Sequence, residues 1–263
     1  MKRVFITGAS SGIGAALAQR YAEQGAVLGL VARRKENLEQ LAASLPNAGS
    51  HRLYALDVTD HLALSGAAAD FIAGFGGVDV VIANAGVSRG TLTEFSEDLP
   101  VFERIVATNL VATVATFAPF LATLKAQARA GNRDGRLVGI GSVAGIRGLP
   151  GSGAYSASKA AVMSYCESLR VELNGSGIKV VTITPGYIDT PMTRNNAYPM
   201  PFLMPVEKFA ARAVDTIHAG VSYKVIPWQM GLVASALRRL PDWVYDFAFS
   251  KAPHKARGMA DKP

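Results

Sequence analysis

Three residues within the stretch 141–159 have the types and the spacing of an acid–base centre. A helix beginning near Tyr155 places Tyr155 and Lys159, four residues apart, on the same face. A neighbouring ammonium favours the tyrosinate and lowers the pKa of a tyrosine from its ordinary value of about 10. Ser142 follows a predicted strand, and its hydroxyl suits the binding of a carbonyl or alcohol oxygen. The pattern predicts proton transfer at such an oxygen, although a tyrosine and a lysine at this spacing also occur as an ordinary helical pair.

A glycine-rich turn follows the first predicted strand, residues 4–6, and precedes an alanine-rich helix that ends near Gln24. Glycine permits positive φ and lets the backbone approach a pyrophosphate, whose charge is favoured by the N–H groups at the helix start. A simple tight connection is the alternative, but the place of the turn between strand and helix favours a nucleotide site. The residues predicted to bind the dinucleotide here are Gly8, Ser10, Ser11, Gly12, Ile13 and Gly14.

The end of the second predicted strand, residues 27–31, bears on the choice of cofactor. An acidic residue at this place binds the ribose hydroxyls of NAD, whereas a basic residue accommodates the 2′-phosphate of NADP. Here Ala32 stands in place of the acid, and Arg33 and Arg34 follow it. Because cations are disfavoured at a helix N-terminus, a phosphate partner explains them better than a solvated helix start does. We therefore predict NADP rather than NAD, with Arg33 and Arg34 in its site.

The remaining predicted strands, at 52–56, 78–83, 137–140, 180–184 and 223–226, alternate with helices at 35–45, 61–75, 101–130, 155–173 and 206–219. This alternation predicts an α/β fold: a single doubly wound, Rossmann-like domain with a parallel sheet. Ligands of such sheets bind at the carboxyl ends of the strands, where Asp57 and Asn84 stand. Asn84 either contacts the cofactor or ties neighbouring strands together. Asn109, inside an apolar helix, is predicted to kink it.

The composition suits a globular protein of enzyme size, with 263 residues of which 49% are hydrophobic and 18% charged. The single cysteine, Cys166, cannot form an internal disulfide, and we expect it in the core of a cytoplasmic protein. No uninterrupted apolar stretch reaches the roughly 18 residues of a spanning helix. The net charge of +7 is scattered along the chain, so we predict no nucleic-acid partner. We predict no metal site.

Several short motifs resemble, in order and spacing, those of the short-chain dehydrogenase/reductase family of the NADP-preferring type. They are TGASSGIG at 7–14, Asp57-Val58, Asn84-Ala85-Gly86, Asn109, Ser142, YSASK at 155–159 and PGYIDTPM at 185–192. The resemblance covers residues 3 to about 192 and implies a catalytic tetrad of Asn109, Ser142, Tyr155 and Lys159. Tyr155 would be the acid/base and Ser142 would orient the substrate. Lys159 would bind the nicotinamide ribose and acidify Tyr155, and Asn109 would hold a proton-relay water.

The same resemblance implies the rest of the cofactor site. Asp57 and Val58 would contact the adenine, and Asn84, Ala85 and Gly86 would contact the two riboses. The nicotinamide carboxamide would be held by Pro185, Gly186, Ile188 and Thr190. Tyr155 and Lys159 belong to the cofactor site as well. Pro185-Gly186 is also a turn that the end of a strand requires, and this simpler role stays open.

A segment after the last motif has the composition of a substrate lid. Residues 187–205 combine four prolines with tyrosines, including Tyr198, and with phenylalanine and methionine. Long loops beside a cofactor cleft are usually functional, and an apolar one suits a hydrophobic substrate. A surface loop packed on its own helix is the alternative.

The chain beyond residue 227 departs from the commonest family pattern. We predict two short apolar helices, near 230–240 and 241–250, as a helical extension (228–263) of the catalytic domain (1–227). Residues 238–263 hold six Lys or Arg, among them Lys251 and Lys262, against three Asp. We expect the helices to cover the substrate cleft or to pack on a partner subunit, while peripheral membrane contact is possible but less favoured. The expected oligomer is a dimer formed through the helices that contain Asn109 and Tyr155.

Together these features predict an NADP(H)-dependent oxidoreductase that interconverts a carbonyl and an alcohol on a hydrophobic small-molecule substrate. A non-catalytic dinucleotide sensor or scaffold on the same fold is the alternative. The intact set of Ser142, Tyr155 and Lys159 argues against it, because a binding protein has no need of an acidified tyrosine. An epimerase or dehydratase is less favoured because such relatives usually carry a larger substrate domain.

Overall fold

The computed structural model describes residues 1–194, 196, 199–250, 255 and 257. Its centre is a parallel sheet in the order β3-β2-β1-β4-β5-β6-β9. The strand bounds are β1 Arg3–Thr7, β2 Val27–Ala32, β3 Arg52–Ala55, β4 Val80–Ala83, β5 Arg136–Ile140, β6 Lys179–Pro185 and β9 Tyr223–Ile226. The strand order reverses between β1 and β4, and a ligand crevice is expected at that point. The predicted α/β fold with one parallel sheet is confirmed.

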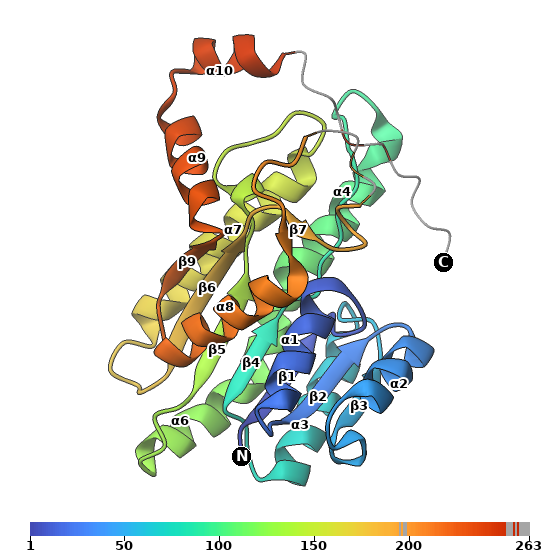
Figure 1. Cartoon of the computed structure of the whole chain (residues 1–263), viewed down its shortest axis with the longest axis vertical. Coiled ribbons are helices and arrows are strands. Elements are labelled where there is room, and N and C mark those ends of the chain that lie inside the picture. Colours follow the sequence, from blue (N-terminus) through green and yellow to red (C-terminus); the bar gives the residue numbers. More distant parts are fainter. Residues whose placement is uncertain (195, 197–198, 251–254, 256, 258–263) are drawn as a thin grey trace.

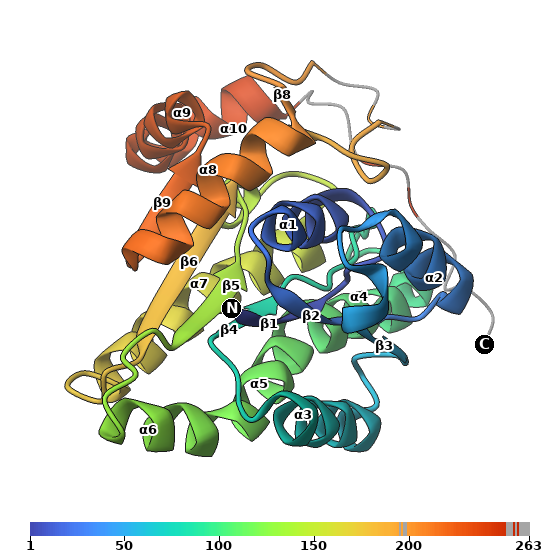
Figure 2. The same cartoon turned by 60° about the horizontal axis from the view of Figure 1, so that its bottom comes forward.

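Helices cover both faces of the sheet (Figures 1 and 2). The first layer contains α1 Gly12–Glu23, α2 Lys35–Ser44 and α8 Val206–Ala219, whose apolar residues form one core with the sheet. The second layer contains α3 His61–Phe75, α4 Leu99–Val106, α5 Ala112–Phe117, α6 Leu121–Arg129 and α7 Gly153–Glu172. Cys166 of α7 is buried in the second core, as predicted, and burial raises the pKa of its thiol to about 11. Central strands such as β2 are buried on both faces, which accounts for their unbroken apolar sequence.

The helix predicted at 101–130 is interrupted in two places. A π-helical turn, Ala107–Val111, surrounds Asn109, and a 3-10 turn, Ala118–Phe120, contains Pro119. Proline has no backbone N–H to donate, and a π turn leaves backbone groups without regular partners. The carbonyl oxygen of Asn109 accepts a 2.8 Å hydrogen bond from the Thr113 hydroxyl. The predicted kink is therefore present, as a π turn.

The same helical run, Ser96–Arg129, is the one candidate membrane span among the described residues, by length and apolar composition alone. Its Phe117, Phe120 and Leu124 belong to the second core. A core helix of a water-soluble domain passes the same test, so we assign the run to the core.

The predicted C-terminal helices are present as α9 Trp228–Arg239 and α10 Asp242–Phe249. They lie beyond the carboxyl ends of the strands (Figure 1). Met230, Ala234 and Tyr245 are buried. Trp228, Leu232, Trp243 and Phe247 are 59–87% exposed, so the expectation that this apolar surface is buried holds for only part of it. The predicted lid residue Tyr198 and the basic residues Lys251 and Lys262 lie outside the described residues.

Candidate active site

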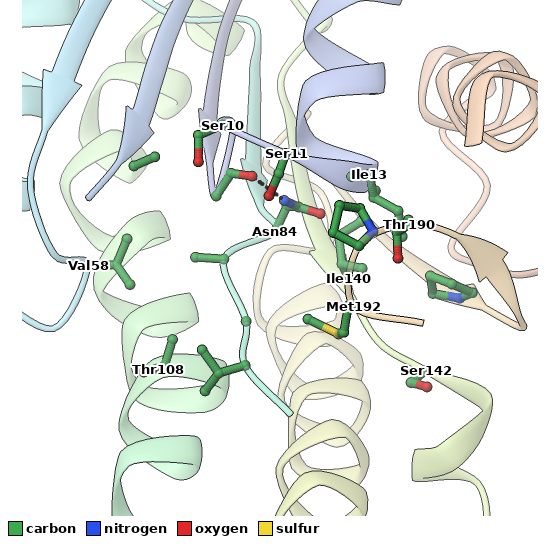
Figure 3. A pocket seen from close by; sticks show the side chains of 18 of the residues that line it. Ser10, Ser11, Ile13, Val58, Asn84, Thr108, Ile140, Ser142, Thr190 and Met192 are labelled. Atoms are coloured by element: carbon green, nitrogen blue, oxygen red, sulfur yellow. Dashed lines mark hydrogen bonds between the residues drawn. The ribbon is translucent and has the colours of Figure 1, made fainter. Parts of the chain in front are cut away.

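A cavity of about 320 Å³ opens at the carboxyl ends of the strands, beside the reversal between β1 and β4. Figure 3 shows Ser10 and Ser11 of the glycine turn at one end and Thr108 and Ser142 at the other. The sequence-predicted residues that line it are Gly8, Ser10, Ser11, Gly12, Ile13, Arg33, Arg34, Asp57, Val58, Asn84, Ala85, Gly86, Ser142, Tyr155, Lys159, Pro185, Gly186, Ile188 and Thr190. Two predicted residues, Gly14 and Asn109, are not among the lining residues.

Gly14 serves the packing of the glycine turn. A Cβ at this position would lie 2.1 Å from the carbonyl oxygen of Gly8 and 2.6 Å from the side-chain amide of Asn84. Gly8 has φ +66°, and a Cβ there would lie 2.7 Å from the Cα of Ala85. These contacts bring the first and fourth strand ends together, and they leave no room for larger residues.

Asn84 fulfils the structural role that the sequence left open. Its amide donates 3.1 Å hydrogen bonds to the carbonyl oxygens of Thr7 and Gly8, so it ties the end of β4 to the end of β1. It lines the cavity as well, which keeps a contact with a cofactor available.

The start of α1 has the donor groups that a pyrophosphate requires. Ser11 is the N-cap residue of α1, but its hydroxyl makes no capping hydrogen bond. The first turn of the helix contains no acidic residue, so the positive end of the helix dipole faces the cavity without a side-chain counter-charge. The residues present here therefore fit a phosphate group of a dinucleotide.

The end of β2 carries a cation beside an anion. The Arg33 guanidinium lies 3.9 Å from the Asp57 carboxylate, and the Arg33 side chain is 55% exposed. Burial raises the pKa of the Asp57 carboxyl, but hydrogen bonds from the Thr59 amide and hydroxyl, with the charge of Arg33, outweigh it and hold the pKa below its ordinary value. Asp57 is thus an anion at neutral pH. Ala32, which also lines the cavity, offers no acidic group.

Lys159 and Tyr155 share the cavity wall that α7 provides, and the hydrogen bond of the ammonium goes to the end of β5. The Lys159 Nζ donates a 2.8 Å hydrogen bond to the carbonyl oxygen of Ile140 and lies 5.9 Å from the centroid of the Tyr155 ring. Burial lowers the pKa of Lys159 to about 8. Burial also raises the pKa of Tyr155, against a hydrogen bond with Ser142 that lowers it. The acidification of Tyr155 by Lys159 stays a prediction, since the hydrogen bond found here joins the ammonium to the carbonyl of Ile140.

Ser142 is placed by the short 3-10 turn that follows β5. Its side chain is the N-cap of the turn Val143–Gly145, and its Oγ accepts a 3.2 Å hydrogen bond from the Ala144 N–H. The hydroxyl proton is free to be donated to another oxygen, and Tyr155 is the neighbour whose pKa this hydrogen bond lowers. Ser142 and Tyr155 thus lie together in the cavity lining, while their predicted roles, oxygen binding for Ser142 and acid/base for Tyr155, stay predictions.

Asn109 is fully buried and holds the loop after β4. Its Oδ1 accepts a 2.8 Å hydrogen bond from the Val87 N–H, and its Nδ2 donates to the Val87 carbonyl and to the Ser158 hydroxyl. The structure thus shows a positioning role for Asn109, whereas the relay water that the resemblance implies stays a prediction. Its neighbour Thr108 lines the cavity instead.

Sequence reasoning missed several lining residues. They are Ala32, Leu56, Val87, Thr108, Ile140, Gly141, Pro191, Met192 and Thr193. Each one except Thr193 is within two residues of a predicted site residue, so the position along the chain was the available signal. Thr193 closes the turn after β7 (Ile188–Asp189) by donating to the Ile188 carbonyl and accepting from the Thr190 N–H.

The predicted lid segment contributes one wall. Its first part, Ile188 to Thr193, lines the cavity. Met204, in β8 (Met204–Pro205), is buried against the first core, and Phe202 and Leu203 are about half exposed. Along the described part of α9 and α10, no residue lines the cavity, so these helices do not cover it.

The comparisons with known proteins agree with this geometry. The family profile described as short chain dehydrogenase matches residues 2–199. An uncharacterized oxidoreductase of Myxococcus xanthus (strain DK1622) is 37% identical over 251 residues, covering 94% of this chain and 96% of that protein. A 2-dehydro-3-deoxy-L-rhamnonate dehydrogenase (NAD(+)) of Sphingomonas sp. (strain SKA58) is 35% identical over 190 residues, covering 71% of this chain and 72% of that protein.

A solved structure shows the same architecture. The crystal structure of 3-ketoacyl-(acyl-carrier-protein) reductase from Brucella melitensis complexed with NADH matches with a TM-score of 0.78 and 25% identity, covering 86% of this chain and 96% of that one. The family profile spans more than half of the chain, and its motifs meet at one cavity. The chain belongs to the short chain dehydrogenase family of nicotinamide-dependent oxidoreductases.

Proposed function

We propose that this protein is an NADP(H)-dependent oxidoreductase that interconverts a carbonyl and an alcohol, with Tyr155 as the acid/base. One observation carries the proposal: Ser142, Tyr155 and Lys159 line the same cavity as the glycine turn at the start of α1. In a dinucleotide bound along that cavity, the glycine turn would hold the phosphates and the three residues would lie near the nicotinamide. The fit of the turn to phosphate supports this orientation.

The residues divide the chemistry among them. The nicotinamide supplies the hydride that the carbonyl carbon accepts in reduction. Ser142 binds the carbonyl oxygen through its hydroxyl, and Tyr155 donates a proton to the same oxygen as negative charge develops there. Lys159 holds the nicotinamide ribose, and its position near β5 keeps its charge within the buried end of the cavity. In the direction of alcohol oxidation, Tyr155 accepts the proton and must begin as the tyrosinate.

The preference for NADP rests on the end of β2. Ala32 lacks the carboxylate that would bind ribose hydroxyls, and Arg33 and Arg34 line the cavity beside it. Arg34 is the N-cap of α2 and makes no capping hydrogen bond, as a cationic side chain cannot. Asp57 and Glu36 offset part of the charge of these two cations, and a 2′-phosphate would be a further anion that the guanidinium groups can bind. The names of two relatives mention NAD(+) or NADH, which makes the choice an experimental question.

The substrate end of the cavity favours an apolar compound. Val87, Ile188 and Met192 contribute apolar side chains to the cavity lining, and Met192 is 44% exposed. These side chains offer dispersion contacts and few hydrogen bonds, so a carbonyl on a hydrophobic body suits them better than a polyol does.

The first experiment is a turnover assay with a panel of ketones, aldehydes and alcohols, each with NADPH or NADH. The absorbance of the reduced nicotinamide reports the reaction directly. Turnover of apolar carbonyls that is faster with NADPH supports the proposal. Tight binding of NADPH without turnover of any panel member would favour the non-catalytic dinucleotide sensor.

We also propose a cytoplasmic homodimer formed through the helical run that contains Asn109 and through α7. Val111 and Val114 are 42% and 37% exposed and, being three residues apart, lie on one side of the run. Val171, on α7, is 63% exposed. Apolar side chains at these positions are explained by a second copy of the chain that covers them.

A further inference from the structure

The loop that carries Ser142 is held on its far side by the C-terminal helices. Arg147 follows the Ser142 turn, and its side chain is only 13% exposed. The guanidinium donates hydrogen bonds to the carbonyl oxygens of Leu237 and Leu240 and to the Asp242 carboxylate. It also lies 3.9 Å above the centroid of the Tyr245 ring. Arg147 thus contacts the end of α9, the start of α10 and the face of an α10 side chain.

These contacts satisfy groups that a helix end leaves open. Leu237 is in the last turn of α9, and its carbonyl accepts a 3.3 Å hydrogen bond from the N–H of the C-cap residue Leu240. The carbonyl of Leu240 lies past the last helical N–H. The guanidinium supplies donors to both, and its charge is favourable at the C-terminus of a helix. Tyr245 completes the contact, since its hydroxyl donates a 2.5 Å hydrogen bond to the carbonyl oxygen of Gly148.

The path from Arg147 to Ser142 is short and closely packed. Within the turn, the Gly145 N–H donates to the Ser142 carbonyl at 2.9 Å and the Ile146 N–H donates to the Val143 carbonyl at 3.1 Å. A Cβ on Gly145 would lie 2.7 Å from the backbone nitrogen of Ala160, so the turn rests directly on α7. Two backbone hydrogen bonds thus connect the residues before Arg147 to Ser142 and its neighbour Val143.

Residues 149–151, which form the second part of the loop, are held by other hydrogen bonds. The Leu149 N–H donates to the Ser156 hydroxyl, and the Thr91 N–H donates to the Gly151 carbonyl. Neither bond restrains the segment between Ser142 and Gly148. Among the described residues outside α7 and the loop itself, the hydrogen bonds to this segment come from α9, α10 and the residues between them.

We propose that Arg147 is a positioning residue, which holds the Ser142 hydroxyl against Tyr155 by anchoring the catalytic loop to α9 and α10. The inference rests on the proposed function, because it gives the C-terminal extension a part in that reaction. It also explains why the extension is present although it does not line the cavity.

The test is a double-mutant cycle of Arg147→Ala and Ser142→Ala, measured by steady-state kinetics over a range of pH. If Arg147 acts through Ser142, Arg147→Ala lowers kcat by about tenfold in the wild-type background and by less than about twofold in the Ser142→Ala background. The dissociation constant of NADPH changes by less than about twofold, because the phosphate and ribose residues are elsewhere. In alcohol oxidation, the acidic limb of the pH profile moves to higher pH, as the Ser142 hydrogen bond no longer lowers the pKa of Tyr155.

Two further variants separate positioning from folding. Tyr245→Phe removes only the hydroxyl that binds Gly148, and we expect a smaller change in the same direction in kcat and in the pH limb. Arg238→Ala is the matched control, since Arg238 is an exposed cation of α9 for which no ion pair is found in the described part of the chain. It should leave kcat and the pH profile unchanged.

Amide hydrogen exchange gives a readout that does not require turnover. Arg147→Ala should raise the exchange of residues 143–146 about tenfold or more, whereas Arg238→Ala should not. An inactive wild-type protein would contradict the proposed function, and exchange would still decide the role of Arg147. The inference is overturned if Arg147→Ala lowers only the melting temperature, or if its effect on kcat is undiminished in the Ser142→Ala background. Unchanged exchange at 143–146 would overturn it as well.

Discussion

The ammonium of Lys159 donates a 2.8 Å hydrogen bond to the carbonyl oxygen of Ile140, the last residue of β5. Lys159 is 5% exposed, and burial lowers the pKa of its side chain from 10.5 to about 8. The bond places the charge of Lys159 at the end of the strand that leads to Ser142. The lowered pKa of Lys159 makes the stability of the protein depend on pH.

We expect the stability of the wild-type protein to rise relative to that of Lys159→Met between about pH 8 and pH 10.4. In this interval the unfolded chain still holds the proton that the folded protein has released, so the unfolded state binds more protons. Below about pH 8 both states are protonated and the difference is constant. Urea unfolding of both proteins at several pH values measures this difference in the free energy of unfolding. A difference that stays flat from pH 7 to pH 10 would contradict the lowered pKa.

Arg33→Ala should weaken the binding of NADPH roughly ten- to a hundredfold, because a charge-assisted hydrogen bond to the 2′-phosphate is lost. The affinity for NADH, which has no such phosphate, should change little. Fluorescence titration with each cofactor makes the comparison. Lys35→Ala is a matched control, since Lys35 is exposed and lies 3.7 Å from Glu39 outside the cavity lining. Equal losses for NADPH and NADH would show that Arg33 does not recognise the phosphate.

Asn109→Ala should lower the free energy of unfolding by about 1–3 kcal/mol, because the partly buried N–H and carbonyl of Val87 lose their partner. Chemical unfolding followed by circular dichroism is the measurement. Asn174→Ala, a change at an exposed asparagine beyond α7, should cost little. If both variants are equally stable, the Asn109 side chain does not hold the loop after β4.

Val114→Glu should convert the proposed dimer to a monomer, because a carboxylate would be buried where an apolar contact is expected. Light scattering after size-exclusion chromatography gives the mass. Val221→Glu, at a similarly exposed valine between α8 and β9, should leave the dimer intact. A wild-type protein that is monomeric at all concentrations would contradict the proposed interface.

The fold and most of the cavity lining could be predicted from the sequence, because both depend on local pattern. Apolar strands end in glycine, asparagine or serine, and a parallel sheet brings such ends to one edge whatever the details of packing. Asn84 and Ser142 are examples. Gly14 shows the limit of this reasoning, since the motif marks the residue but only the structure shows that it contacts Gly8 rather than the cavity.

The direction of side chains and the long-range contacts could not be predicted. The spacing of Tyr155 and Lys159 predicts a common helix face. The ammonium nevertheless donates its hydrogen bond to the carbonyl of Ile140, which is in β5 and not in the same helix. Asn109 is recognisable as a polar residue in an apolar helix, yet its partner Val87 is 22 residues away. The contact of Arg147 with Leu240 spans 93 residues and has no periodic signature.

The central claim is that Tyr155 transfers the proton, and Tyr155→Phe tests it most directly. The change removes one oxygen and keeps the ring, so the cavity and the binding of NADPH should be preserved. Single-turnover rates on the best carbonyl of the panel should fall by a factor of about 100 or more, since general acid–base catalysis contributes about 100- to 10000-fold. A variant that binds NADPH normally and retains a near wild-type rate of hydride transfer would contradict the account.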